Sequence, residues 1–208
     1  MLINEALDGE YLPWAVTATF GDNFPALAKR KAAGHDLPLE KLSRLGMLVN
    51  YNGYGGSVED LHIHPADLYR ALSSFETPMA FLESGSKVYE QLDQGYETDL
   101  SQAQQAKEID KTDKGVVITL PDAAGSRRIS GVFGNQLAQS HSERAHAILT
   151  AQEGGFLVSI RAPLSNRQGA DTLALQFESG GGRSAAAGIN HLQESDLTRF
   201  IEAFRAAF

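Results

Sequence analysis

Ser179-Gly180-Gly181-Gly182-Arg183-Ser184-Ala185-Ala186-Ala187-Gly188 is the stretch that says most about the fold of this chain. Three successive glycines leave their backbone N–H groups uncovered, which is the composition of a loop that binds an anion. Arg183 follows directly, and a guanidinium can hold a phosphate through two parallel hydrogen bonds. A plain tight loop between a helix and a strand has the same composition and remains the alternative.

Short β-branched segments surround this stretch in the second half of the chain. Residues 116–120, 145–150 and 155–160 are predicted strands, and a glycine-containing turn joins the last two. Residues 134–140 and 172–178 are predicted short helices. Residues 194–208 form the clearest predicted helix, because their apolar side chains recur on one face. This half therefore predicts an α/β unit with a mixed sheet.

The sequence pattern of the first half of the chain predicts helices instead. Segments 11–20, 24–33 and 38–49 are predicted helices, and two more begin near Pro65 and Pro78. From residue 86 to about 110 the chain is polar, with apolar residues every fourth position up to Leu100, as in a long linking helix. A structureless linker is the alternative. We expect three parts: helical residues 1–84, connecting residues 85–113 and an α/β domain at 114–208.

Composition excludes several classes of protein. The 208 residues contain no cysteine, which excludes a disulfide scaffold, a thiolate zinc site and a cysteine nucleophile. The net charge is −8, so nothing attracts the whole chain to a long nucleic acid. The charge is uneven, because residues from Lys114 onward are nearly neutral and rich in arginine. No signal peptide or membrane-spanning run is evident, which predicts a cytoplasmic protein without a membrane partner.

Three motifs of the second half resemble the DHH-associated C-terminal domain of the DHH phosphoesterases. The glycine-rich stretch is similar to the signature of that domain, although Arg183 stands where a histidine is usual. Residues 128–138 resemble its strand-to-helix opening, and Ser159-Ile160-Arg161 resembles a strand end that faces substrate. Arginine binds phosphate but does not shuttle a proton near neutral pH, so an acid–base role at position 183 is in doubt.

The resemblance implies a phosphate-binding site and a nucleotide or oligonucleotide ligand. Its residues would be the three arginines and three glycines of the motifs: Arg128, Arg161, Gly180, Gly181, Gly182 and Arg183. Residues 15–22 resemble the last metal motif of the catalytic domain, with Asp22 as a ligand for manganese or magnesium. A helix-terminal aspartate is the alternative reading of Asp22.

No Asp-His-His triplet occurs in the sequence, although it gives the family its name. We therefore expect the C-terminal part of a longer phosphoesterase, in which this chain alone holds no metal and does not catalyse hydrolysis. Two alternatives remain at this point. One is a nucleic-acid-binding module without chemistry, and the other is an assembly role that includes a homo-oligomer.

Overall fold

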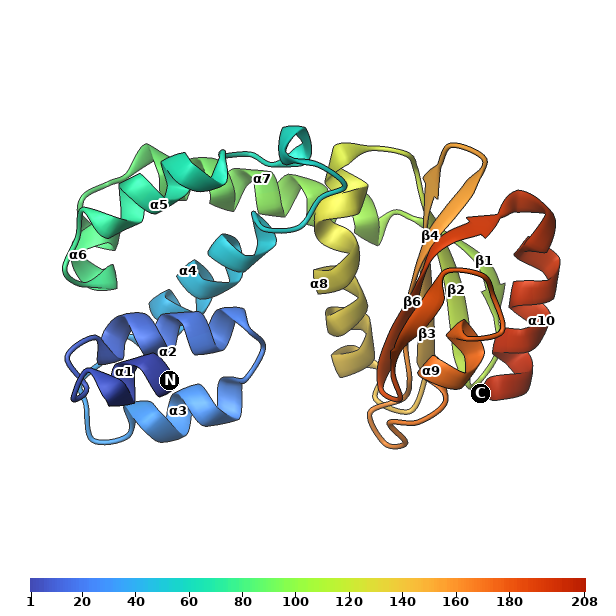
Figure 1. Ribbon diagram of the computed structural model, residues 1–208, viewed down its shortest axis with the longest axis horizontal. Coiled ribbons are helices and arrows are strands. Elements are labelled where there is room, and N and C mark those ends of the chain that lie inside the picture. Colours follow the sequence, from blue (N-terminus) through green and yellow to red (C-terminus); the bar gives the residue numbers. More distant parts are fainter. The chain divides into compact units, whose positions relative to one another are not determined.

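The computed structural model describes residues 1–208. They form two compact units, Met1–Thr98 and Asp99–Phe208. Ten α-helices and one six-stranded sheet make the chain a mixed α/β protein, as the sequence predicts (Figure 1). None of the helices combines the length and the apolar character that crossing a bilayer requires.

The first unit is helical. Proline lies in the first turn of four of its helices, where its missing N–H leaves no hydrogen bond unmade. Its elements are α1 (Leu2–Ala6), α2 (Leu12–Gly21), α3 (Pro25–Ala32), α4 (Leu39–Tyr51), a 3-10 turn (Val58–Asp60), α5 (Pro65–Ser73), α6 (Pro78–Glu83) and the first part of α7 (Lys87–Gln104). The predicted helices of the first half are confirmed.

Helices α2 and α4 approach each other closely at Gly46. A Cβ atom at this position would lie 2.1 Å from the backbone oxygen of Thr17, so only glycine permits the contact. The apolar side chains beside this crossing form one cluster with α3, made of Val16, Phe20, Ala28, Ala32 and Leu42. Burial of this cluster supplies the hydrophobic stabilisation of the α2–α4 layer.

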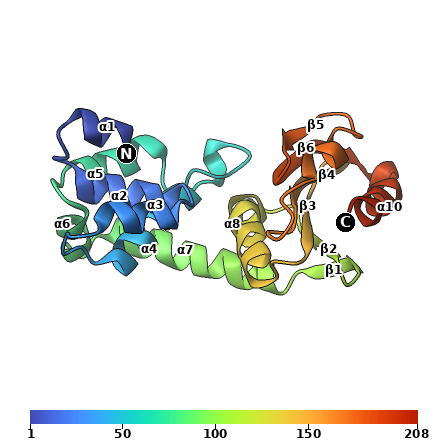
Figure 2. The same cartoon turned by 90° about the horizontal axis from the view of Figure 1, so that it is seen from below.

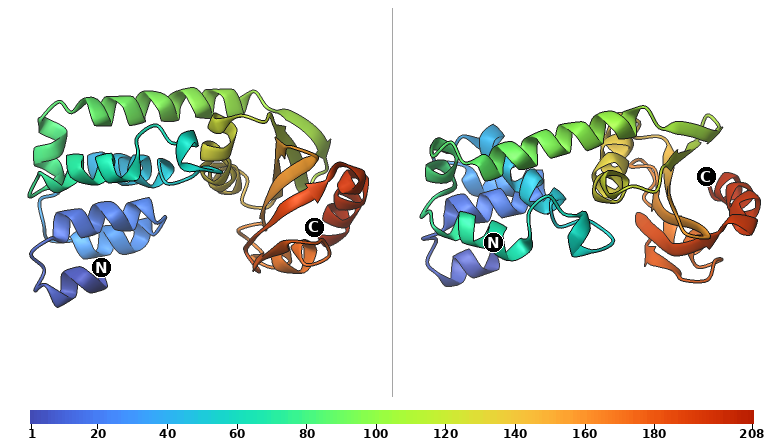
Figure 3. Two further views of the ribbon diagram at one scale, coloured as in Figure 1. Left: turned by 45° about the horizontal axis from the view of Figure 1, so that its top comes forward. Right: turned by 90° about the horizontal axis from the view of Figure 1, so that it is seen from above.

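Helix α7 is a single long helix, as Figure 3 shows, but it is shorter than the predicted connecting segment 85–113. It ends at Gln104, and residues that were expected to continue it form strand β1 (Lys107–Lys111). The reason is visible in the pattern of apolar residues, since the every-fourth repeat stops at Leu100. Ile109 instead packs against the core of the second unit, which favours an extended edge strand with charged residues around it.

The sheet of the second unit is mixed. Its other strands are β2 (Gly115–Leu120), β3 (Ala145–Gln152), β4 (Gly155–Arg161), β5 (Gly180–Arg183) and β6 (Ala186–Gln193). The order across the sheet is β1-β2-β3-β4-β6-β5, which can be followed in Figure 2. Only β2 and β3 are parallel, and helix α8 (Ala124–Ser140) connects them. The three predicted strands therefore form the middle of the sheet.

The two faces of the sheet are covered differently. One face packs on α9 (Ala170–Ala174) and α10 (Leu197–Ala207), with Phe200 and Phe204 fully buried in the main core. A 3-10 turn (Glu194–Asp196) precedes α10, which shortens the predicted helix 194–208 at its start. Helix α8 lies on the opposite face (Figure 1), where Gly134 packs against Ile148 of β3 and Arg161 of β4.

Three predictions about local structure are wrong. Residues 128–138 lie wholly within α8, so they contain no strand, and this helix begins ten residues before the predicted residue 134. Residues 180–183 form edge strand β5 and not a loop, because glycine does not prevent pairing with β6. The short helix expected at 172–178 is α9, which ends at Ala174.

His146 is a buried polar residue of the second unit. It lies on β3 and is 0% exposed, and neither ring nitrogen makes a hydrogen bond. Burial, together with the positive charges of His141 and Arg144, lowers its pKa from 6.5 to about 4. The side chain is therefore neutral inside the folded protein at neutral pH.

The stability of the second unit should fall as the pH drops from 7 to 5. The unfolded chain binds a proton at His146 below pH 6.5, whereas the folded chain does so only near pH 4. We expect the free energy of unfolding to decrease by about 1–2 kcal/mol over this interval in urea titrations. His146→Leu should remove most of this slope, and His191→Ala, at an exposed position, should retain it. Equal slopes in both variants would contradict the assignment.

Candidate anion-binding site

Two arginines lie in one cross-strand row of the sheet. Arg161 of β4 pairs with Ala186 of β6, and Ala186 pairs in turn with Arg183 of β5. Residues directly opposite one another in antiparallel strands carry their side chains on the same face. Arg161 and Arg183 therefore share a face, with two strand spacings of about 4.8 Å each between them.

The surface between these arginines is nearly bare backbone. The next row consists of Ser159, Gly188 and Gly181, and it has only one side chain beyond a hydrogen. A Cβ atom on Gly181 would meet nothing within 4 Å, so the space above it is open. We call this surface the arginine shelf; it comprises Ser159, Arg161, Gly181, Arg183, Ala186 and Gly188.

The guanidinium of Arg161 is held in a fixed orientation at one side of the shelf. Its Nε donates to Oδ1 of Asn135 on α8 at 2.9 Å, and Nη1 donates to Oγ of Ser159 at 2.9 Å. Nη1 also donates to the backbone oxygen of Ile160 at 3.1 Å. These bonds limit the rotamers of a long side chain, so less conformational entropy remains to be lost when an anion binds.

Arg183 differs from Arg161, because its side chain is exposed at the edge of the sheet and makes no ion pair. Such a guanidinium keeps all of its donors for a ligand. The shelf thus has one braced arginine and one exposed arginine on either side of a surface whose other residues are serine, alanine and glycine. Above Gly181 a small anionic group can approach the backbone without a steric clash.

The three glycines do not form the converging set of amides that the sequence suggests. The N–H of Gly180 donates to the backbone oxygen of Phe177 at 3.1 Å and is no longer available. The N–H of Asn190 on β6 donates to the backbone oxygen of Ser179. Because hydrogen-bonded pairs alternate along antiparallel strands, the N–H of Gly181, two residues further on, points toward β6. By the same alternation, the amide of Gly182 faces away from the sheet.

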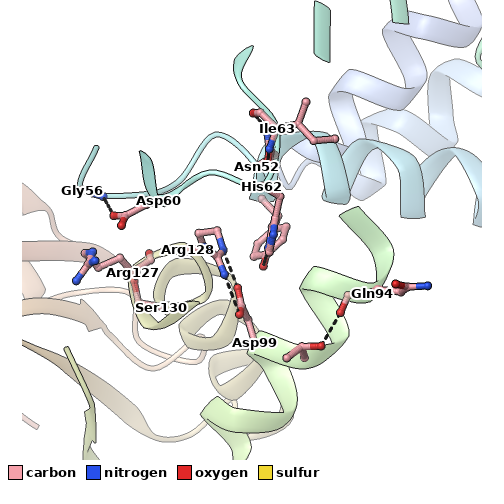
Figure 4. A network of polar contacts seen from close by, with 12 residues as sticks. Asn52, Gly56, Asp60, His62, Ile63, Gln94, Asp99, Arg127, Arg128 and Ser130 are labelled. Carbon is pink, nitrogen blue, oxygen red and sulfur yellow. Dashed lines mark hydrogen bonds and ion pairs between the residues drawn. The ribbon is translucent and has the colours of Figure 1, made fainter. Parts of the chain in front are cut away.

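Arg128, the third predicted arginine, lies elsewhere. It is buried on α8, and its Nε and Nη2 donate to the two carboxylate oxygens of Asp99 at 2.8 and 3.0 Å (Figure 4). It precedes Asn135 by seven residues, or about 10 Å along the helix axis. The structure therefore brings Arg161 and Arg183 together and leaves Arg128 in a buried ion pair.

Asp22 is exposed and follows the last residue of α2 in the first unit. Nowhere in the chain do three or more histidine, aspartate or glutamate side chains gather in a group that could hold a metal ion. The donors present therefore do not fit a two-metal centre, and a role for Asp22 as one ligand remains a prediction.

Two residues that decide the surroundings of these arginines were not predicted from the sequence. Asn135 orients Arg161 from α8, and Asp99 neutralises Arg128 from α7. Asn135 is part of the segment 128–138. That segment was predicted as a strand-to-helix opening, and this prediction did not distinguish the Asn135 amide from its neighbours. Asp99 lies in a polar helix with several carboxylates, and no local pattern distinguishes it from the others.

Several solved structures share the fold of this chain. A DHH-domain protein described as a member of a family of ribosomal proteins has a TM-score of 0.56 and 15% identity, over 92% of this chain and 48% of that chain. The pGpG-specific phosphodiesterase PggH from Vibrio cholerae has a TM-score of 0.56 and 15% identity, over 88% and 67%. Exonuclease RecJ bound to manganese has a TM-score of 0.55 and 16% identity, over 95% and 54%.

This chain has the fold of the DHH phosphoesterases. It spans about half to two thirds of the length of these DHH proteins. No protein-family model and no curated protein matches its sequence. At 15–16% identity the likeness concerns the path of the backbone, and the DHH fold here includes both the helical first unit and the α/β second unit.

Replacing Arg128 should destabilise the second unit strongly. Arg128→Ala leaves the buried carboxylate of Asp99 without its charge partner, which costs about 3–5 kcal/mol. The double variant Arg128→Met/Asp99→Leu should recover much of this loss, because neither charge is then buried alone. Chemical denaturation measures both values. A loss below about 1 kcal/mol in Arg128→Ala would show that the pair is effectively exposed.

The three glycines should respond differently to alanine. At Gly180 a Cβ would lie 1.8 Å from the backbone oxygen of Ala174, and Gly182 has φ +144° with its Cβ 2.4 Å from Cα of Ala187. Each of these alanines should lower the free energy of unfolding by about 1–3 kcal/mol. Gly181→Ala should change it by less than about 0.5 kcal/mol. Equal losses at all three positions in urea titrations would contradict the description of β5.

Proposed function

We propose that the second unit binds phosphate groups of a nucleotide or short oligonucleotide, and that the chain is the substrate-binding portion of a DHH-type phosphoesterase. The observation that supports this proposal is the cross-strand row in which Arg161 and Arg183 flank small residues. A guanidinium matches the geometry of two phosphate oxygens and remains charged at any physiological pH.

The net charge of the chain and the open surface at Gly181 favour a small ligand. The net charge of −8 repels a long polyanion, whereas two arginines on one face attract a phosphate locally. The open space above Gly181 also suits a ligand that lies flat on the sheet. Two proteins of the same fold are described as a pGpG-specific phosphodiesterase and an exonuclease, which is consistent with phosphodiester ligands.

This proposal divides the chain into three parts. The helical part of a DHH-like catalytic domain is residues 1–84, the substrate-binding domain is residues 114–208, and the segment that connects the two is residues 85–113. Asp22 would supply one carboxylate to manganese or magnesium if other donors joined it. The histidines and carboxylates of the chain do not complete such a site around it. What the chain itself supplies is a place where phosphate oxygens are held and oriented.

Arg183→Ala should weaken binding of a 5′-phosphorylated dinucleotide at least tenfold at low salt, because a hydrogen-bonded charge is lost. Fluorescence anisotropy with a labelled dinucleotide measures the change. Arg199→Ala is the matched control, since Arg199 lies on α10 at the other face of the sheet. Binding that is undetectable at low salt, or equally affected by both variants, would refute the proposal.

Gly181→Val tests the shelf independently of charge. The side chain fills the open space above the strand and should lower affinity for the same dinucleotide about tenfold, while the protein stays folded. Unchanged affinity in this variant would mean that the ligand does not use the shelf.

A parallel assay with manganese and bis(p-nitrophenyl) phosphate separates an enzyme, which releases nitrophenolate, from a binding module, which does not.

A further inference from the structure

The turn that follows Arg183 is connected to two other segments of the second unit. Residues 184–185 link β5 to β6, and the N–H of Ala170 on α9 donates to the backbone oxygen of Ser184 at 3.1 Å. The N–H of Ala162 donates to the backbone oxygen of Ala185 at 3.0 Å. Ala162 directly follows Arg161, so the same turn contacts the chain next to both arginines of the shelf.

A carboxylate reinforces this turn. Oδ2 of Asp171 on α9 accepts a hydrogen bond from Oγ of Ser184 at 2.9 Å, and its Oδ1 accepts one from the N–H of Thr172 at 2.8 Å. The hydrogen bond from Ser184, followed by that from Thr172, lowers the pKa of the Asp171 carboxyl. The carboxylate is thus ionised and oriented toward the residue that follows Arg183.

We propose that Asp171 and Ser184 are positioning residues of the arginine shelf, which hold the backbone of Arg183 at a set distance from that of Arg161. This inference rests on the proposed function and makes it more specific. With the separation fixed, both arginines engage one ligand that carries two phosphate groups. A ligand with a single phosphate uses one arginine and gains nothing from the fixed distance.

The consequence is a selectivity between ligands, which a general loss of stability would not produce. Two-point attachment is strong only when both contacts fit at once, so a looser turn weakens the second contact. A nucleoside monophosphate reports on a single contact. A dinucleotide with a 5′-phosphate has two phosphate groups and reports on both.

The experiment compares affinities of these two ligands for four variants of the full chain. Asp171→Ala and Ser184→Ala should each lower the affinity for the dinucleotide about fivefold to tenfold. Each should change the affinity for the monophosphate less than twofold. Ser184→Thr retains the hydroxyl and should restore dinucleotide affinity. The double variant Asp171→Ala/Ser184→Ala should be no weaker than either single one, because the two side chains act through one hydrogen bond.

Two kinds of failure can be told apart. If Arg183→Ala leaves dinucleotide binding unchanged, the proposed function is wrong. If Arg183→Ala weakens binding but Asp171→Ala and Ser184→Ala do not, or weaken both ligands equally, the positioning role is wrong. Thermal unfolding of each variant identifies any loss of structure. Ser184→Thr then separates a positioning role from a purely structural one, because only a positioning role predicts that it restores the ratio of dinucleotide affinity to monophosphate affinity.

Discussion

The antiparallel pairing of β4, β6 and β5 is the constraint on which the candidate site depends. Because side chains alternate between faces, a one-residue slip of β5 would move Arg183 to the face that packs on α9 and α10. The register is maintained from both sides of the strand. Gly180 packs tightly against α9, and the turn after Arg183 is bonded to α9 and to the end of β4.

The same residue type has three different environments in this unit, and burial separates them. Arg128 is nearly inaccessible and its charge is neutralised by one buried carboxylate, so it does not face a ligand. Arg161 is half-buried and is oriented by an amide, a hydroxyl and a carbonyl. Arg183 is exposed. Only the last two lie in the cross-strand row of the arginine shelf.

Much of the secondary structure could be predicted, whereas the site could be predicted only in part. The helices of the first unit and the three central strands follow from local patterns of apolar residues and from proline at helix starts. Arg161 and Arg183 were predicted as site residues because their motifs resemble those of the DHH-associated domain. Two of the errors share a cause: β1 and β5 are edge strands, whose short polar or glycine-rich sequences acquire their structure from a neighbouring strand.

The sequence by itself determined an α/β chain with a helical first half, a similarity to DHH phosphoesterases and an arginine after three glycines, since these are properties of consecutive residues. Tertiary structure alone decided which arginine meets which partner. Arg128 and Asp99 are far apart in the chain, as are Arg161 and Arg183. Their neighbours depend on strand register and helix packing, because distances between remote residues arise only when the chain is folded.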